Sequence, residues 1–303
     1  MRIFVTGGSG QTGPTVVTEL ITAGHTVTGL ARSDASAARL ESLGATPHRG
    51  SLNDLDSLRR GAETADGVLH MAYGGAFSDL DDMMRRDTNA IKALGQPLEN
   101  LGKPLVITSG TLVMPAGRES TEQDEPDPNG LAAFRITGER ACLDFADRGV
   151  RASVVRLAPT VHGAEDHGFI PMLIATARKT GVSAYVGDGS NRWPAVHRLD
   201  AAALFRLALE KAPAGSVLHG VAESGVTMKS IAETIARGLD LPPVSLTPDQ
   251  AAGHYISPFM AIAYAYDAPV SSAHTQELLG WTPTHPTLLD DLEHGDYLTT
   301  QGV

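Results

Sequence analysis

Residues 3–14 read IFVTGGSGQTGP, a short apolar run followed by a glycine-rich loop and a proline. The apolar run predicts a buried strand, and Pro14 suits the first turn of a helix, because its missing N–H costs nothing there. Gly7, Gly10 and Gly13 have the spacing of a dinucleotide-binding turn between a strand and a helix. In such a turn the first glycine allows the bend, the second admits a pyrophosphate, and the third lets helix and strand pack closely. The N–H groups that begin the helix then hold the negative charge.

The second predicted strand, residues 25–30, is followed by Ala31 and Arg32. NAD-binding proteins usually place an acid here to hold the ribose 2′-hydroxyl, whereas an arginine favours the 2′-phosphate of NADP. Arg32, with Ser33 after it, therefore predicts NADP(H). Asp34 is the one local feature that favours NAD.

The first half of the chain alternates between strand and helix patterns. Further strands are expected at 67–71, 105–108 and 152–157, and helices from 14 and at 35–43, 54–60, 87–101 and 138–147. This alternation predicts an α/β fold, a Rossmann-like doubly wound parallel sheet. Ligands of such sheets bind at the carboxyl ends of the strands.

Composition excludes several classes of partner. The 303 residues carry a formal net charge of −11, which argues against nucleic acid, and no stretch is apolar enough to span a membrane or act as a signal peptide. The single cysteine, Cys142, rules out an intrachain disulfide, and we expect a cytoplasmic protein with a small-molecule substrate. The histidines lack metal-ligand spacing, so no metal is expected.

Several motifs make the chain resemble the extended short-chain dehydrogenase/reductase superfamily, best known for sugar epimerases and dehydratases. Residues 6–13 match the superfamily's glycine motif T-G-x-x-G-x-x-G, and residues 70–72 match its H-x-A motif. Residues 193–202 resemble its V-H-V-D-D-V-A segment, and residues 278–283 resemble its C-terminal L-G-W-x-P motif. Residues 106–110 resemble the strand that carries the family's catalytic Ser/Thr. The resemblance implies cofactor contacts at Gly7, Ser9, Gly10, Gln11, Thr12, Gly13, Arg32, Ser33, Ser51, Leu52, Met71, Ala72, Arg135, Leu157 and Pro159.

The same resemblance implies how the chain is organised. Residues 1–160 with about 196–221 are expected to form the NADP-binding domain, and residues 161–195 and 222–303 a smaller substrate-binding lobe. A homodimer through the helices near 87–101 and 138–147 is also implied.

One departure from the family concerns its catalytic Tyr-x-x-x-Lys pair. The tyrosine position falls on Leu131 and the lysine position on Arg135, and none of the six tyrosines has a lysine four residues later. The chain thus resembles an atypical subgroup of the superfamily. One such subgroup carries His-x-x-x-Arg, and this chain keeps the arginine but has leucine for the histidine.

Hydride transfer can survive this loss, because acid catalysis contributes about 10²–10⁴-fold and positioning of the reactants contributes more. Ser109, slightly favoured, Thr111 and Tyr73 are the candidate proton donors, and His162 and His167 are alternatives because a histidine is a plausible acid near neutral pH. Arg135 is a candidate for holding the nicotinamide ribose. The candidates for the substrate side are His162, His167 and Trp193.

These observations favour an NADPH-dependent oxidoreductase that reduces a small carbonyl or imine compound. Two alternatives stay open: a nucleotide-sugar epimerase or dehydratase, against which the missing pair counts, and a non-catalytic NADP-binding regulator.

Overall fold

The computed structural model describes residues 1–73 and 79–299, and at its centre is a seven-stranded parallel sheet. The strand order is β10-β6-β5-β4-β1-β2-β3, so the direction of winding reverses between β1 and β4. This arrangement confirms the predicted doubly wound α/β fold. The strands are β1 (Arg2–Thr6), β2 (Thr26–Ala31), β3 (Thr46–Arg49), β4 (Gly67–His70), β5 (Pro104–Gly110), β6 (Arg151–Leu157) and β10 (Ser216–Gly220).

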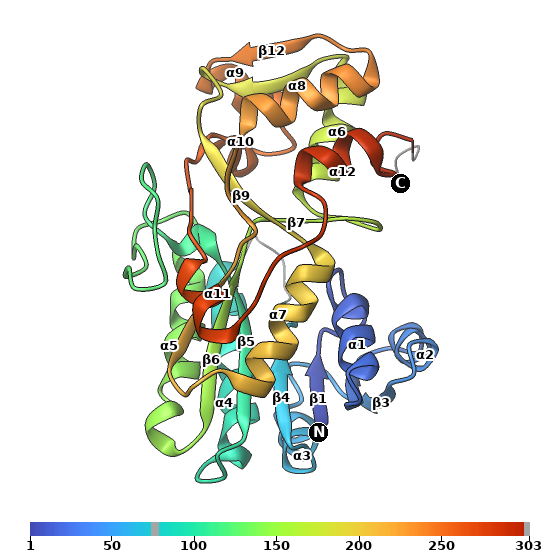
Figure 1. Ribbon diagram of the computed structural model, residues 1–303, viewed down its shortest axis with the longest axis vertical. Helices are drawn as coiled ribbons and strands as arrows, with labels where there is room; N and C mark the ends of the chain where they lie inside the picture. Colours follow the sequence, from blue (N-terminus) through green and yellow to red (C-terminus); the bar gives the residue numbers. More distant parts are fainter. Residues whose placement is uncertain (74–78, 300–303) are drawn as a thin grey trace.

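Helices cover both faces of the sheet (Figure 1). One core lies beneath α1 (Gly13–Thr22), α2 (Asp34–Ser42) and α7 (Arg198–Lys211). The core of the other face lies beneath α3 (Leu55–Glu63), α4 (Leu80–Gly95) and α5 (Ile136–Leu143). The central strands β1, β4 and β5 are apolar on both sides, as burial between two helical layers requires.

Three local predictions differ from the structure. The helix expected at 87–101 spans Leu80–Gly95, because Asp79 caps its first turn and a 3₁₀ turn with Pro97 follows its last. The helix expected at 138–147 is α5, which begins and ends earlier. Strand β3 was not expected, because its sequence Thr-Pro-His-Arg carries no apolar pattern, and an edge strand tolerates both proline and polar residues.

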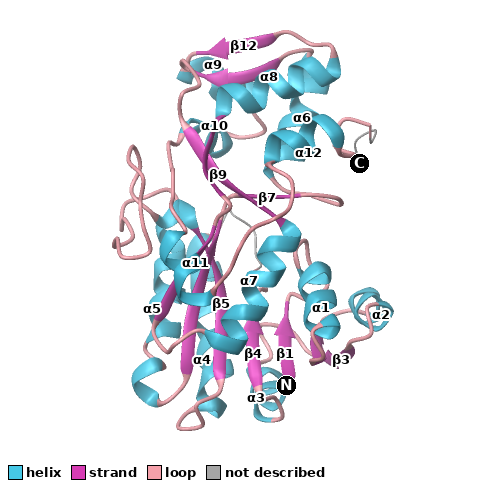
Figure 2. Ribbon diagram, in the orientation of Figure 1, coloured by secondary structure: helices cyan, strands magenta, loops and turns pink. Residues whose placement is uncertain are grey.

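A second group of elements stands above the carboxyl ends of the strands (Figure 2). It contains the sheet of β7 (Thr160–His162), β9 (Arg192–His197) and β11 (Glu223–Thr227), and the pair β8 (Ser183–Val186) and β12 (Pro243–Leu246). Its helices are α6 (Phe169–Thr180), α8 (Met228–Leu239), α9 (Pro248–His254), α10 (Pro258–Ala265) and α12 (Leu288–His294).

This upper lobe has a core of its own, which includes Trp193, Ile231 and Tyr264. The chain returns from it to the main sheet twice, at α7–β10 and at α11 (Ala273–Leu279), which packs on β10. We propose on this basis that residues 161–195 and 222–303 form a substrate lobe. None of the helices in the described part of the chain has the length and apolar character needed to cross a bilayer.

Candidate functional site

The glycine loop forms the turn between β1 and α1, and its geometry has no room for side chains at two positions. Gly7 has a φ of +78°, and a Cβ atom there would lie 2.6 Å from the backbone nitrogen of Ala72. A Cβ atom at Gly13 would lie 2.1 Å from the Gly7 carbonyl oxygen. At Gly10 a Cβ atom would meet only that same oxygen, at 3.2 Å, so its other side is open to a ligand.

Helix α1 begins without a side-chain cap. Its N-cap residue, Thr12, accepts no hydrogen bond from the helix through its side chain, so the first N–H groups are left for an anion. They face a cleft of about 1040 Å³ at the carboxyl ends of the strands. The cleft is lined by Gly7, Ser9, Gly10, Gln11, Thr12, Gly13, Leu30, Arg32, Ser33, Ala35, Ser36, Arg39, Ser51, Leu52, Asn53, Met71, Ala72, Tyr73, Arg86, Thr108, Leu157 and Phe205.

One end of the cleft is positively charged. Arg32 and Arg39 both line it, whereas Asp34 points to Arg49, with 2.7 Å between carboxylate and guanidinium. The Arg39 guanidinium donates to the carbonyl oxygen of Ser9 at 3.4 Å, at the edge of the glycine loop. Arg39 was missed at the sequence level, because an arginine on the exposed side of a helix carries no local signal.

Several hydroxyl groups without partners lie where strands β4 and β5 end. Within the described residues, the buried hydroxyls of Tyr73, Thr108, Ser109 and Thr111 make no hydrogen bond. Buried polar groups are nearly always paired, so such a group indicates a place where a ligand or water binds. Tyr73 and Thr108 line the cleft, but Ser109 and Thr111 do not. Since side chains alternate along a strand, Ser109 points to the face opposite Thr108.

Arg135 lies behind Tyr73 and not on the cleft wall. The central carbon of its guanidinium, Cζ, is 3.6 Å from the centroid of the Tyr73 ring, and its Nη2 donates to the carbonyl oxygen of Thr108. The Phe134 ring stacks on the same tyrosine, with 6.2 Å between centroids. Leu131, at the position of the family's tyrosine, packs against the core of the upper lobe.

A loop of the upper lobe, residues 163–168, reaches the glycine loop. The Gln11 side-chain amide donates to the Asp166 carboxylate at 2.9 Å, and the Tyr297 hydroxyl donates to its other oxygen at 2.7 Å. Glu165 in the same loop lies 4.0 Å from Arg39. We call residues 163–168 the clasp loop, since they connect the upper lobe to the nucleotide end of the cleft.

Four residues expected at the site lie away from the cleft. Trp193 is buried in the core of the upper lobe, where its indole N–H donates to the Tyr266 carbonyl oxygen at 3.0 Å. His162 is fully buried and pairs with Asp291 at 2.6 Å. His167 belongs to the clasp loop, and Pro159 follows β6; neither is part of the cleft wall.

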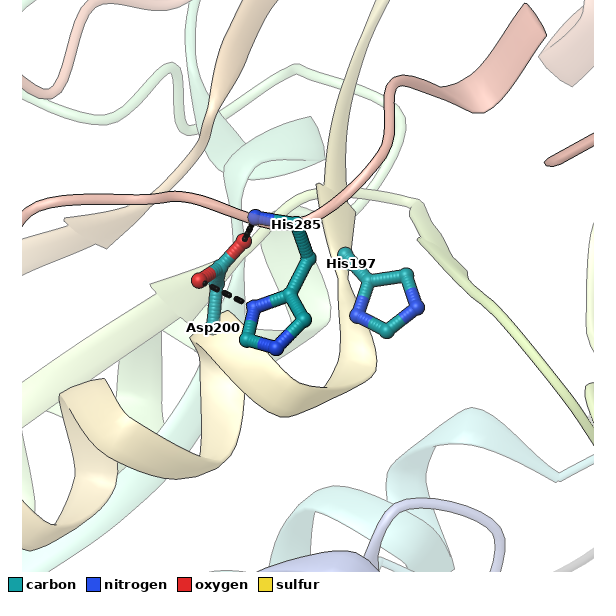
Figure 3. A group of neighbouring side chains, drawn as sticks. All are labelled: His197, Asp200 and His285. Atoms are coloured by element: carbon teal, nitrogen blue, oxygen red, sulfur yellow. Dashed lines mark hydrogen bonds and ion pairs between the residues drawn. The ribbon is translucent and has the colours of Figure 1, made fainter. Parts of the chain in front are cut away.

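A second polar cluster, His197, Asp200 and His285, joins α7 to the C-terminal segment (Figure 3). The two imidazole rings stack with 4.8 Å between centroids and an interplanar angle of 10°. The Asp200 carboxylate pairs with His285 Nδ1 at 2.7 Å and accepts the backbone N–H groups of Thr284 and His285. The nitrogen His197 Nδ1 accepts the N–H of Leu199. These contacts show that the cluster connects helix α7 to the C-terminal segment.

The residues of the cleft fit a dinucleotide. The glycine loop and the uncapped helix suit a pyrophosphate, the arginines suit a further phosphate, and the unpartnered hydroxyls suit a polar ring at the opposite end.

Comparisons with known proteins agree with this architecture. Residues 3–219 match the model of the NAD dependent epimerase/dehydratase family. An uncharacterized protein of Schizosaccharomyces pombe, C2A9.02, is 48% identical over 98% of this chain and 100% of its own length. The 4-hydroxy-2-methyl-3-oxo-4-farnesyl-3,4-dihydroquinoline-1-oxide ketoreductase of Stigmatella aurantiaca is 29% identical over 72% of this chain and 67% of its own. The structure of MoeE5 in complex with UDP-glucose and NAD has a TM-score of 0.77 at 22% identity, covering 99% of this chain and 98% of that one.

Proposed function

Because the chain belongs to the NAD dependent epimerase/dehydratase family, we propose that it is an NADPH-dependent oxidoreductase that reduces a small carbonyl or imine compound. The choice of NADPH over NADH rests on Arg32. It lines the cleft, and it has no hydrogen-bond or ion-pair partner within residues 1–73 and 79–299. The ketoreductase of Stigmatella aurantiaca supports the reaction class.

The proposed contacts follow the cleft from end to end. Gly7 to Gly13 and the first turn of α1 hold the pyrophosphate, and Ser51 and Leu52 lie beside the adenine. Arg32 and Arg39 pair with the 2′-phosphate, because guanidinium groups form charge-assisted hydrogen bonds with phosphate oxygens. Met71, Ala72 and Leu157 flank the nicotinamide, which supplies hydride to the substrate when the cofactor is bound.

The choice of cofactor is tested by the substitution Arg32→Glu. We expect it to raise the NADPH dissociation constant at least about tenfold, because a hydrogen bond to a charged group is worth about 1.5–3 kcal/mol. The NADH dissociation constant should change little, because NADH lacks the phosphate. Arg49→Glu is the matched control, since Arg49 is an arginine outside the cleft. Equal effects of Arg32→Glu on both cofactors would remove Arg32 from phosphate binding.

The reaction is tested by following NADPH consumption with a panel of aldehydes, ketones and imines. Turnover of at least one compound is expected. Tight NADPH binding without turnover of any compound would favour the non-catalytic regulator. Conversion of a UDP-sugar without net NADPH consumption would favour an epimerase.

A further inference from the structure

We infer that Tyr73 and Arg135 together replace the missing Tyr-x-x-x-Lys pair, with Tyr73 as the group that gives a proton to the carbonyl oxygen or imine nitrogen of the substrate. This inference rests on the proposed reductase function and names the acid of that same site. The tyrosine comes from the end of β4 and the cation from the 3₁₀ turn Ala133–Arg135 that precedes α5, so the two groups meet only in the folded chain.

The side chains of Tyr73 and Arg135 are in close contact, and neighbouring residues hold both of them in place. The guanidinium lies over the face of the phenol ring, with 3.6 Å between Cζ and the centroid. A hydrogen bond from Arg135 Nη2 to the Thr108 carbonyl oxygen fixes the guanidinium at the end of β5. The ring of Phe134 stacks on Tyr73 and restricts its rotation. The cation is thus held against the tyrosine before any ligand arrives.

The hydrogen of the Tyr73 hydroxyl has no acceptor among the described residues, because Arg135 can only donate. The hydroxyl is buried, and the tyrosine ring forms part of the cleft wall. A buried donor without an acceptor has a free-energy cost. A carbonyl oxygen or imine nitrogen in the cleft would accept that hydrogen and remove this cost.

The electrostatic surroundings suit a donor at neutral pH. Burial raises the pKa of Tyr73 above its usual value, and the nearby charge of Arg135 opposes that rise. The phenol therefore carries its proton at pH 7. Once the proton has left, the phenolate lies beneath a guanidinium that cannot itself be deprotonated, and this contact stabilises the charged form.

The proton and electron balance of the step is simple. The electron pair that forms the new C–H bond comes with the hydride of NADPH. The Tyr73 O–H bond breaks, and its proton forms the O–H or N–H bond of the alcohol or amine product. The phenolate then takes a proton from solvent water.

Other polar side chains of the described residues are less well placed than Tyr73 to give a proton to the substrate. Ser109 and Thr111 lie off the cleft wall, and Arg135 does not release its proton. The hydroxyl of Tyr266 already donates to the Met114 carbonyl oxygen at 3.2 Å.

The experiment compares the whole wild-type chain with Tyr73→Phe, which keeps the ring and removes only the hydroxyl. With an electron-poor aromatic aldehyde as substrate, we expect kcat to fall by about 10²-fold or more, while NADPH binding stays unchanged and thermal stability does not fall. Tyr255→Phe is the matched control, because it removes a hydroxyl that only donates to the Ala184 carbonyl oxygen in the upper lobe. A Tyr73→Phe variant with wild-type kcat would overturn the inference and leave the reductase function intact.

A second readout needs neither cofactor nor turnover. An ultraviolet titration of tyrosinate in the free protein, taken as the difference from Tyr73→Phe, isolates the ionisation of Tyr73. Arg135→Met should raise the pKa of Tyr73, because the opposing charge is gone. An unchanged titration would show that Arg135 is not coupled to Tyr73. If the wild type reduces no substrate while this shift is present, the proposed function fails and the Tyr73–Arg135 coupling stands.

Discussion

Single side chains decide the chemistry of this site more than its fold does. Leu131 occupies the position of the family's tyrosine and packs into the upper lobe, whereas Arg135 keeps a cation in place. Because leucine cannot give up a proton, the acid that protonates the substrate has to come from another element of the fold. The tyrosine on the cleft wall that contacts Arg135 is Tyr73.

A prediction at the residue scale concerns the ion pair between Glu139 of α5 and Arg156 of β6. Their side chains are 3% and 4% exposed, and the guanidinium donates to the two carboxylate oxygens at 3.0 and 2.7 Å. Glu139→Ala should lower the free energy of unfolding by about 3–5 kcal/mol, because it leaves an unpaired charge in the core. Urea unfolding measures this loss.

The matched control is Asp34→Ala, which breaks an exposed pair with Arg49. It should cost less than about 1 kcal/mol, since exposed ion pairs contribute little. Similar losses in the two variants would contradict the argument from burial.

At the scale of elements, the clasp loop connects the upper lobe to the glycine loop. Gln11 of the glycine loop and Tyr297 near the C-terminus both donate to Asp166. The contact holds the upper lobe against the glycine loop, beside the cleft in which we propose that the dinucleotide binds.

We predict that Gln11→Ala speeds NADPH dissociation by a few-fold to about tenfold, because it removes a hydrogen bond to a carboxylate. Asp166→Ala should have a similar effect, and the double variant should be no faster than either single one. Stopped-flow fluorescence with displacement by excess NADP measures the rates. Fully additive effects would show that the two side chains act independently.

At the scale of the whole molecule, the C-terminal segment ties the upper lobe back to the edge of the main sheet. His219 of β10 pairs through Nδ1 with the Ser271 carbonyl oxygen at 2.8 Å, and its backbone N–H donates to Thr275 Oγ1 at 2.8 Å. Thr275 in turn donates to the carboxylate of Glu122 at 2.6 Å.

The burial of His219 makes the free energy of unfolding depend on pH. Burial lowers the pKa of His219 to about 4, whereas an unfolded histidine titrates near about 6.5. Between these values the unfolded chain binds a proton that the folded chain does not, so stability is full above about pH 6.5 and falls as the pH drops toward 4. The expected loss is roughly 1–3 kcal/mol.

The role of His219 is tested by measuring urea unfolding across this pH range for the wild type and two variants. His219→Gln should reduce the dependence, and the remainder should come from His197 and His254, whose pKa values burial also lowers. His274→Gln, at an exposed histidine of α11, should leave the dependence unchanged. A His219→Gln variant with the wild-type slope would assign the dependence to other groups.

The local sequence was sufficient for the class of fold and for identifying residues that line one end of the cleft. The glycine loop, Arg32, Ser51 and residues 71–72, which are predicted to contact the cofactor, all line one cleft, because each of them follows a strand of the parallel sheet. Parallel strands then bring these ends to one edge. The bounds of α4 and the strand β3 could not be predicted, since caps and edge pairing leave weak signals.

The sequence by itself determined a doubly wound sheet with a dinucleotide turn, because hydrophobic periodicity and glycine spacing are local properties of the chain. Only the tertiary structure decided which side chains meet. It turned Ser109 away from the cleft, buried Trp193 in a separate core, and placed Arg135 on the ring of Tyr73. The physical reason is that each of these contacts joins segments far apart in the chain. Their packing is set by the whole core, and no local pattern encodes it.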